Sequence, residues 1–199
     1  KIATSRIMNE ADYRLFLTAK LIAGGGISYK RIMGNSGNFG GRIRENEYAF
    51  YGSLKLVHRN LIINAGLRKE FYKGLNPDPQ FSAGVRYKIR KGIVIRSSVS
   101  SKFRKPTFNE KYWKPGGNPD LRPEKGRGGE LTLEWQSDKI QRNIWMDSRI
   151  TGYFQSIDNW IQWILKDSLS PVEYKKVHAK GLEVWLGYGL NRMDFKVEG

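Results

Sequence analysis

The chain has 199 residues, 39% of them hydrophobic and 27% charged, and it has no cysteine, so disulfides, thiolate nucleophiles and cysteine metal sites are excluded. Lys and Arg outnumber Asp and Glu by 35 to 19, and the formal net charge of +16 suits nucleic acid, anionic lipid or an acidic ligand without choosing among them. No stretch approaches the roughly 18 consecutive apolar residues of a membrane helix, so helical membrane spans are excluded, and any targeting segment is expected to lie outside these residues.

Apolar and polar residues alternate with a period of two along most of the chain, which predicts nine β-strands. In the clearest one, Phe81 to Ile89, one face is fully apolar and the other fully polar. Most of these strands are longer than the roughly five or six residues common in globular sheets, and about ten residues cross a bilayer at a tilt. In chain order, the apolar positions are Tyr13, Leu15, Leu17, Ala19 and Leu21; Tyr48, Phe50, Leu54 and Leu56; Leu61, Ile63, Ala65 and Leu67; Phe81, Ala83, Val85, Tyr87 and Ile89; Ile93, Ile95, Val99 and Phe103; Leu131, Leu133 and Trp135; Ile144, Met146 and Ile150; Leu182, Val184 and Leu186; Met193, Phe195 and Val197.

The connections between these strands alternate in length. Tight turns are expected at 58 to 60, at 90 to 92 and near 190 to 191, with a further short link at 136 to 141. Long polar loops are expected at 24 to 45, 105 to 128 and about 158 to 177, and an intermediate loop at 73 to 80. Antiparallel strands joined in this way place the tight turns at one end of the sheet and the long loops at the other, as in outer-membrane β-barrels.

A soluble β-sandwich also alternates, and it is the structural alternative. Strand length and loop asymmetry favour the membrane barrel, in which the apolar face meets lipid and the polar face lines a lumen. Lys69 falls on an apolar face near a strand end, where its ammonium group can snorkel. The predicted fold class is therefore all-β, an antiparallel transmembrane β-barrel, and the chain is interpreted as a fragment of it.

Two linked motifs stand in the connection at 105 to 128. The stretches "FRKPTFNEKYW" and "GGNPDLRPEKG" resemble the signature of TonB-dependent outer-membrane receptors, in which Arg-x-Pro-[Thr/Ser]-Phe-x-[Glu/Asp]-x-Tyr ends a strand and Gly-Asn-Pro-x-Leu-x-Pro-Glu follows. The stretches "INAGLRKEFY", "FSAGVRYKI", "ITGYFQSIDNWIQWI" and "HAKGLEVWLGY" are similar to successive barrel strands of the same family. The matching motif residues are Arg104, Pro106, Thr107, Phe108, Glu110, Tyr112, Gly117, Asn118, Pro119, Leu121, Pro123 and Glu124.

The resemblance implies a fragment of about nine strands from a 22-stranded barrel, with residues 1–199 in the barrel domain and with the plug domain and terminal strands outside them. It implies an active transporter of the bacterial outer membrane, not an enzyme, that imports a scarce large solute; cobalamin or a ferric siderophore or haem-type chelate ranks first. The implied partners are TonB with its inner-membrane energising complex, the protein's own plug, outer-membrane lipid and lipopolysaccharide, the transported chelate and a surface lipoprotein. Nucleic acid is not among them, and no cofactor or metal is implied.

The motif loop is also expected to be stiff on physical grounds alone. In Asn118-Pro119 and Arg122-Pro123, each proline fixes its own φ and pushes the preceding residue toward extended geometry. The loop is therefore expected to serve geometry more than ligand contact. Its aromatic residues Phe108, Tyr112 and Trp113 are expected to pack against neighbouring loops or the barrel wall, and Glu124 to pair with Arg104 or Arg122.

Aromatic and basic side chains give further candidates. A membrane-interface girdle accounts for Tyr48, Tyr153, Phe154, Trp160 and Trp163, and stacking on a ligand is the alternative for the two tryptophans. The candidate ligand-facing residues are Tyr112, Trp113, Trp160 and Trp163. The basic residues of the first expected long loop either are solvated or meet phosphates of lipopolysaccharide or an anionic ligand; they are Lys30, Arg31, Arg42 and Arg44. A basic lumen wall for carboxylates of a plug is expected from Arg86, Lys88, Arg96, Lys102 and Arg104.

Catalytic chemistry is not indicated. His58 and His178 lie far apart in the sequence and are interpreted as surface residues, and "GGGIS" at 24 to 28 lacks the Lys-Ser/Thr ending of a phosphate loop. The alternative function is a soluble basic β-protein that binds nucleic acid or another polyanion. That alternative predicts cations gathered on one face and interleaved with aromatic residues, whereas Lys and Arg are spread over every expected strand and loop.

Overall fold

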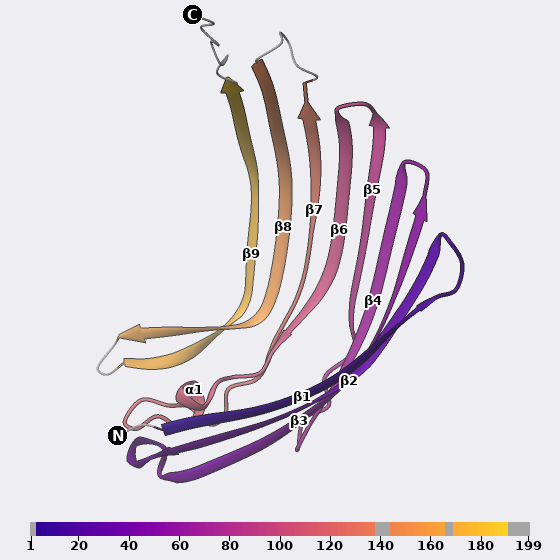
Figure 1. Cartoon of the computed structure of the whole chain (residues 1–199). Helices are drawn as coiled ribbons and strands as arrows, with labels where there is room; N and C mark the ends of the chain where they lie inside the picture. Colours follow the sequence, from indigo (N-terminus) through magenta and orange to yellow (C-terminus); the bar gives the residue numbers. More distant parts are fainter. Residues whose placement is uncertain (1–2, 138–143, 166–168, 191–199) are drawn as a thin grey trace, which may run out of the picture.

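The computed structural model describes residues 3–137, 144–165 and 169–190, and these form one antiparallel sheet of nine strands in sequence order. Each strand pairs with its neighbours along the chain, and β1 and β9 form the two edges, so the sheet is open and curved (Figure 1). The strands are β1 (Ala3–Phe16), β2 (Leu21–Ser36), β3 (Gly41–His58), β4 (Leu61–Tyr72), β5 (Gln80–Arg90), β6 (Ile93–Arg104), β7 (Glu124–Gln136), β8 (Ile144–Leu165) and β9 (Leu169–Leu190).

The predicted alternation gives the sheet two faces of different chemistry. On one face, most side chains are apolar and exposed, as in β9, where the exposed fractions of Leu182, Val184 and Leu186 are 71%, 60% and 75%. On the other face, polar side chains bond across strands, as between Thr132 and Thr151 Oγ1 atoms at 2.9 Å. Because all nine strands form one sheet, its apolar face packs against no second sheet in the described residues. The expected antiparallel barrel wall is confirmed, and the sandwich is not.

The register shows one turn that the sequence analysis missed. The segment from Tyr13 to Leu21 was predicted as one strand, but β1 ends at Phe16 and β2 begins at Leu21. The backbone N–H groups of Leu17 and Thr18 both donate to the carbonyl oxygen of Leu21, at 3.0 and 3.1 Å. The alternating pattern continued through this reversal, and alternation alone carries no information about where a chain turns.

The prediction of long loops at 24 to 45 and about 158 to 177 is wrong, because strands occupy most of these residues. Residues 24 to 45 lie in β2 and β3, which are joined by a short turn that includes the 3₁₀ helix η1 (Gly37–Phe39). The glycines at 24 to 26 suggested a loop, but Gly26 lies in β2 where a Cβ atom would come 2.5 Å from the Tyr51 ring. Residues 158 to 177 lie largely in β8 and β9, whose pairing continues to Leu165 and Leu169.

The remaining connections agree better with expectation. Tight turns lie where they were expected, after His58 and after Arg90, and Arg59 and Gly92 adopt φ angles of 50° and 78° in them. The loop expected at 105 to 128 is shorter, because β7 begins at Glu124. The strand predicted around Met193, Phe195 and Val197 lies outside the described residues, as do most of the links expected at 136 to 141 and 190 to 191. None of the described helices is long and apolar enough to cross a membrane.

The fold brings the β6–β7 loop to the concave side of the sheet. Its helix α1 (Phe108–Tyr112) lies between the loop ends of β1–β3 and the outer part of the β8–β9 hairpin, which bends over it (Figure 1). The bend follows the last β7–β8 pair, Lys125 with Asp158, after which β8 and β9 continue together. The motif loop is therefore enclosed by strands on both sides.

Candidate functional site

Arg104 and Glu124 close the loop that carries both motifs. They are the last cross-strand pair of β6 and β7, and Arg104 donates from Nε to Glu124 Oε2 at 2.7 Å and from Nη2 to Oε1 at 2.6 Å. The same guanidinium donates from Nη1 to both carboxylate oxygens of Glu110, at 3.1 and 3.0 Å. Such two-pronged contacts to a carboxylate fix geometry as well as charge. Arg104 therefore joins the start, the helix and the end of the loop.

Helix α1 begins with a capping box. The Thr107 side chain accepts a hydrogen bond from the backbone N–H of Glu110 at 3.3 Å, and Glu110 Oε2 accepts one from the backbone N–H of Thr107 at 2.7 Å. This reciprocal pair satisfies backbone donors that a helix start leaves free. Pro106 stands just before the cap, where its fixed φ suits the extended entry to the helix. Thr107 and Glu110 thus give the first motif a local structural role.

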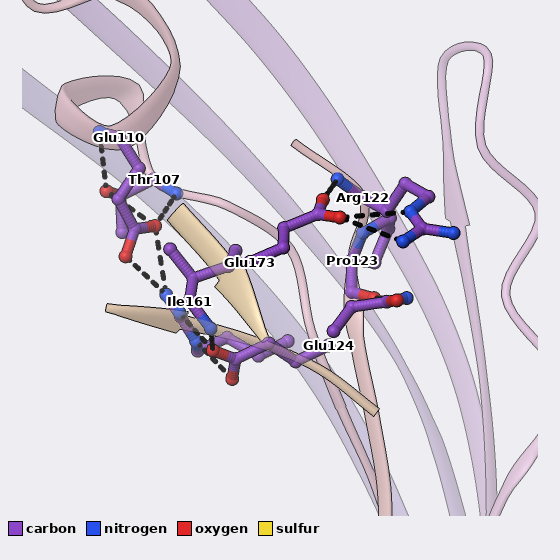
Figure 2. Close-up of polar contacts among 9 residues, drawn as sticks. Thr107, Glu110, Arg122, Pro123, Glu124, Ile161 and Glu173 are labelled. Atoms are coloured by element: carbon purple, nitrogen blue, oxygen red, sulfur yellow. Dashed lines mark hydrogen bonds and ion pairs between the residues drawn. The ribbon is translucent and has the colours of Figure 1, made fainter. Parts of the chain in front are cut away.

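The second motif attaches the loop to β8 and β9. Glu124 Oε1 also accepts the backbone N–H of Ile161 at 2.8 Å, and Glu173 accepts from the Arg122 backbone and guanidinium (Figure 2). Asn159, at a φ of 55°, donates from Nδ2 to the Pro123 carbonyl at 3.0 Å. Of the two arginines expected to pair with Glu124, Arg104 does so, whereas Arg122 pairs with Glu173.

Close packing accounts for the glycine and asparagine of the second motif. A Cβ atom on Gly117 would lie 2.6 Å from the backbone N and 2.7 Å from the carbonyl O of Trp113, so no larger residue fits without a backbone shift. Asn118 Oδ1 accepts the Asp120 N–H at 3.0 Å, and the Asn118 N–H donates to the Glu110 carbonyl at 2.8 Å. Pro119 follows in this turn, and Leu121 is buried beyond it. The loop is folded on itself rather than extended.

Aromatic rings hold the loop on two sides. Trp113 and Trp163 meet edge to face, with ring centroids 5.7 Å apart, so two candidate ligand-facing residues contact each other. Phe108 meets Phe39 of η1 edge to face, with ring centroids 6.4 Å apart, and it contacts Tyr112 in a tilted arrangement at 6.3 Å. Trp160 is paired in register with Tyr174 and is not part of this contact. Tyr112 lines a cavity of about 550 Å³ together with Lys73 and Lys111.

Lys105 fastens the loop to the wall formed by β3 and β4. Its ammonium group pairs with Glu45 and, at 2.7 Å, with Glu47, and it lies 4.9 Å from the centroid of the Tyr72 ring. Glu47 also pairs with Lys30. Lys30 was predicted in a loop but lies in β2, and Lys105, Glu173 and Asn159 were not among the predicted site residues. Val172 and Tyr174 lie two residues apart, and this spacing indicates that β9 begins earlier than predicted.

Two ionisable groups of this loop have shifted pKa values. Both groups lie about 36 Å along the strands from the tight turn before β6. This distance exceeds the length of the roughly 9 to 11 residues that a transmembrane strand needs, so both groups lie outside the membrane-spanning part. Burial raises the pKa of the Glu124 carboxyl, but hydrogen bonds from Arg104 and Ile161 outweigh it and the net pKa lies below its ordinary value. Burial lowers the pKa of Lys105, but its bonds to Glu45 and Glu47 raise it above the ordinary value. Both groups are therefore charged at neutral pH.

Three of the five cations predicted to line the lumen are engaged by other side chains of the chain. Arg96 pairs with Glu134 at 3.0 Å, Lys102 donates to Gln155 at 3.0 Å, and Arg104 is engaged in the loop. Arg86 and Lys88 line a hollow of about 690 Å³ near the tight turns. The described residues hold no group of three or more metal-ligating His, Cys, Asp or Glu side chains. Within those residues, the chemistry of the site is thus one of ion pairs and aromatic contacts.

A single curved sheet with one apolar face, one polar face and a loop folded over the polar face defines the wall of a membrane β-barrel receptor. The chain belongs to the family described as TonB dependent receptor-like, β-barrel, whose model matches residues 4–198. This places it in the bacterial outer membrane. The family match favours the receptor barrel over the soluble polyanion-binding alternative.

Known proteins similar to this chain agree with that family. The chain is 25% identical over 196 residues to the vitamin B12 transporter BtuB of Photobacterium profundum, covering 94% of this chain and 31% of that protein. The siderophore receptor PirA of Pseudomonas aeruginosa superposes with a TM-score of 0.76 at 16% identity, over 92% of this chain and 36% of PirA. The Serratia marcescens hemophore receptor HasR, solved with its hemophore HasA and haem, gives 0.74 at 13%, over 94% and 39%. The chain thus spans about a third of the length of these proteins.

Proposed function

We propose that residues 1–199 form part of the barrel domain of a TonB-dependent outer-membrane transporter, with the plug domain and terminal strands outside these residues. The observation that carries the proposal is the anchoring of the motif loop on the concave face through Arg104, which bonds to both Glu110 and Glu124. A loop held at both ends and along its helix gives a fixed surface at the mouth of the barrel. A fixed surface binds solutes at a lower cost in conformational entropy than a mobile one.

The transported solute in this proposal is cobalamin or a ferric siderophore or haem-type chelate. Its support is the similarity to proteins named as a vitamin B12 transporter, a siderophore receptor and a hemophore receptor. Tyr112 is the candidate ligand contact, because it lines the 550 Å³ cavity at the loop, whereas the Trp113 and Trp163 rings are occupied by each other. Lys73 and Lys111 in the same cavity suit an anionic chelate.

Transport in this proposal needs partners beyond the barrel wall. TonB, energised through the inner membrane, acts on a plug that fills the barrel, and the polar concave face is the surface that meets the plug. Arg86, Lys88 and Arg149 line the hollow near the tight turns and suit plug carboxylates. A surface lipoprotein is a further candidate partner on the loop side.

Uptake by cells tests the proposal. The full-length protein is produced in a bacterium that lacks its own receptors for cobalamin and ferric chelates, with and without TonB, and uptake of labelled cobalamin, ferric siderophores and haem is measured. TonB-dependent uptake of one of these solutes is expected. Uptake that is unchanged without TonB would contradict the mechanism, and the absence of uptake and binding for all three classes would contradict the proposed substrates.

A further inference from the structure

Three arginines lie on the outward, apolar face of the sheet near the loop end of β2 and β3. The register from β1 to β4 runs without a shift, so residues opposite each other share a face. Tyr29 pairs with Tyr48, Arg31 with Asn46, Met33 with Arg44 and Asn35 with Arg42. Arg31, Arg42 and Arg44, here called the arginine patch, therefore share the face of the exposed Ile27 and Phe50.

The height of the arginine patch matches the border of a membrane. Between the tight turn and Tyr29, the outward positions of β2 are Leu21, Ala23, Gly25 and Ile27, and none is charged. Arg31 stands ten residues beyond Leu21, which is about 33 Å along the strand and about 25 Å in height at the usual tilt. That height equals the roughly 25 Å apolar band of outer-membrane barrels, and Tyr29 and Tyr48, whose ring centroids are 5.1 Å apart, lie where an aromatic girdle belongs. The patch thus starts at the level of lipid headgroups.

Acidic residues are confined to one face of this part of the sheet. In the described part of β1 to β4, all acidic residues occupy the inward set, where Glu47 pairs with Lys30 and Lys105 and Glu70 pairs with Arg68. The outward set holds cations alone: the arginine patch and Lys69. Lys69 donates to the Pro77 carbonyl and lies 5.5 Å from the Phe71 ring centroid, so it turns toward the loops as expected for snorkelling. No protein carboxylate of these strands neutralises the patch.

The side chains of the patch are unpaired within the described residues. Arg31 Nε is buried and has no hydrogen-bond partner there, and a buried donor without an acceptor is costly. Arg42 and Arg44 are exposed and form no ion pair there. Arg31 and Arg44 are diagonal neighbours, roughly 7–8 Å apart at the backbone, and Arg42 is two residues from Arg44 on the same face. This spacing allows guanidinium groups from two strands to converge on one anion.

We propose that the arginine patch binds the phosphates of lipopolysaccharide headgroups in the outer leaflet. Guanidinium groups match phosphate oxygens in pairs, and the patch presents them at headgroup height with apolar strand surface below for the acyl chains. Arg31 gains an acceptor for its buried Nε in this complex. Of the four basic residues assigned to a loop by the sequence analysis, Lys30 is excluded because it faces inward and pairs with Glu47.

A binding measurement on the full-length protein tests the patch. The wild type and the triple variant Arg31→Gln, Arg42→Gln, Arg44→Gln are purified from outer membranes, and the affinity for lipopolysaccharide and the amount retained per protein are measured. The matched control, Lys20→Gln, Arg59→Gln, Arg90→Gln, removes the same charge at the tight turns. The triple variant is expected to bind at least tenfold more weakly, since each cation near an anionic lipid surface adds to binding, and the control to bind as the wild type does.

Three outcomes would overturn the proposal: wild-type affinity in the triple variant, an equal loss in the control, or equal binding of lipopolysaccharide whose phosphates have been removed. If the triple variant does not assemble, the single variants Arg42→Gln and Arg44→Gln replace it, each with an expected loss of about threefold. Solute uptake by the same variants is measured in parallel. Uptake that persists while lipopolysaccharide binding falls separates this site from the proposed transport function.

Discussion

Arg104 and Glu124 face each other across the last pair of the β6–β7 ladder and are joined by two hydrogen bonds of 2.7 and 2.6 Å. The pair stands where the chain leaves one strand and enters the next, with a loop of nineteen residues between them. Since Glu124 also accepts the Ile161 N–H, this one carboxylate ties three strands together. Its removal should therefore affect the loop more than the barrel.

Replacing Glu124 with Gln is expected to loosen the motif loop. The Glu124 side chain is 10% exposed and that of Arg104 is 40% exposed, so solvent screening reduces the cost below that of a fully buried pair, to about 1–3 kcal/mol of local opening free energy. Hydrogen exchange of the amides of residues 105 to 123 measures it. Glu134→Gln, which breaks contacts with Arg96 and Arg149 away from the loop, is the control and should leave that exchange unchanged. Equal protection in both variants would refute the anchoring role.

The order of the loop should depend on pH through the same carboxyl. The folded pKa of Glu124 lies below its ordinary value of 4.5, so its contribution is fully present above pH 4.5 and is lost as the pH falls below that value through the folded pKa. Hydrogen exchange or Trp113 fluorescence followed from pH 7 down to pH 3 should show the loop loosening in the acid range. In Glu124→Gln this part of the pH dependence should vanish; a transition of the same size in the variant would assign it to another group.

Trp113 and Trp163 should be energetically coupled. Their edge-to-face contact joins the loop to the β8–β9 hairpin, and such pairs add about 0.5–1.5 kcal/mol beyond burial. The single Ala variants and the double variant form a cycle, read by hydrogen exchange of the loop. Pairing Trp113→Ala with Trp160→Ala gives the control cycle, and similar coupling in both cycles would argue against a specific contact.

Gly117→Ala should distort the second motif, although it adds one methyl group. The new Cβ would lie 2.6 Å from the Trp113 backbone N, and a backbone neighbour cannot move aside as a flexible side chain can. A cost of about 1–3 kcal/mol is expected, with a changed Trp113 fluorescence spectrum. Gly37→Ala is the matched control in a nearby turn, because a Cβ atom there meets nothing within 4 Å. Normal loop protection in Gly117→Ala would contradict this account.

The orientation of the sheet predicts different outcomes for adjacent residues of β7. Leu131 is 58% exposed on the apolar face, so Leu131→Arg should destabilise the protein in the membrane by about 2–4 kcal/mol. Glu130 lies on the polar face, where Ser98 Oγ donates to it, and Glu130→Arg should cost much less. Folding of the full-length variants into lipid vesicles, followed by the heat-dependent shift in gel mobility, measures both. A greater loss for Glu130→Arg would reverse the assignment of the faces.

Strand faces are predictable from the sequence, whereas strand ends are less so. The apolar positions Phe81, Val85 and Ile89 predicted β5 correctly, since side chains of a strand alternate between faces whatever surrounds them. Strand ends were predicted less well, because Gly24 to Gly26 and the polar residues near Asp158 are typical of loops. In the structure, Gly25 and Gly26 make room for the side chains of Tyr13 and Tyr51 from neighbouring strands, and Asp158 is paired with Lys176.

By itself, the sequence determined the strand class, the chemistry of each face and the motif that contains Arg104 and Glu124, because these depend on local alternation and on residues close together in the chain. The tertiary structure alone decided that Glu173 holds Arg122, that Lys105 reaches Glu45 and Glu47, and that Arg31 and Arg44 share an outward face. These contacts join residues far apart in the chain, and only the register between strands brings them together.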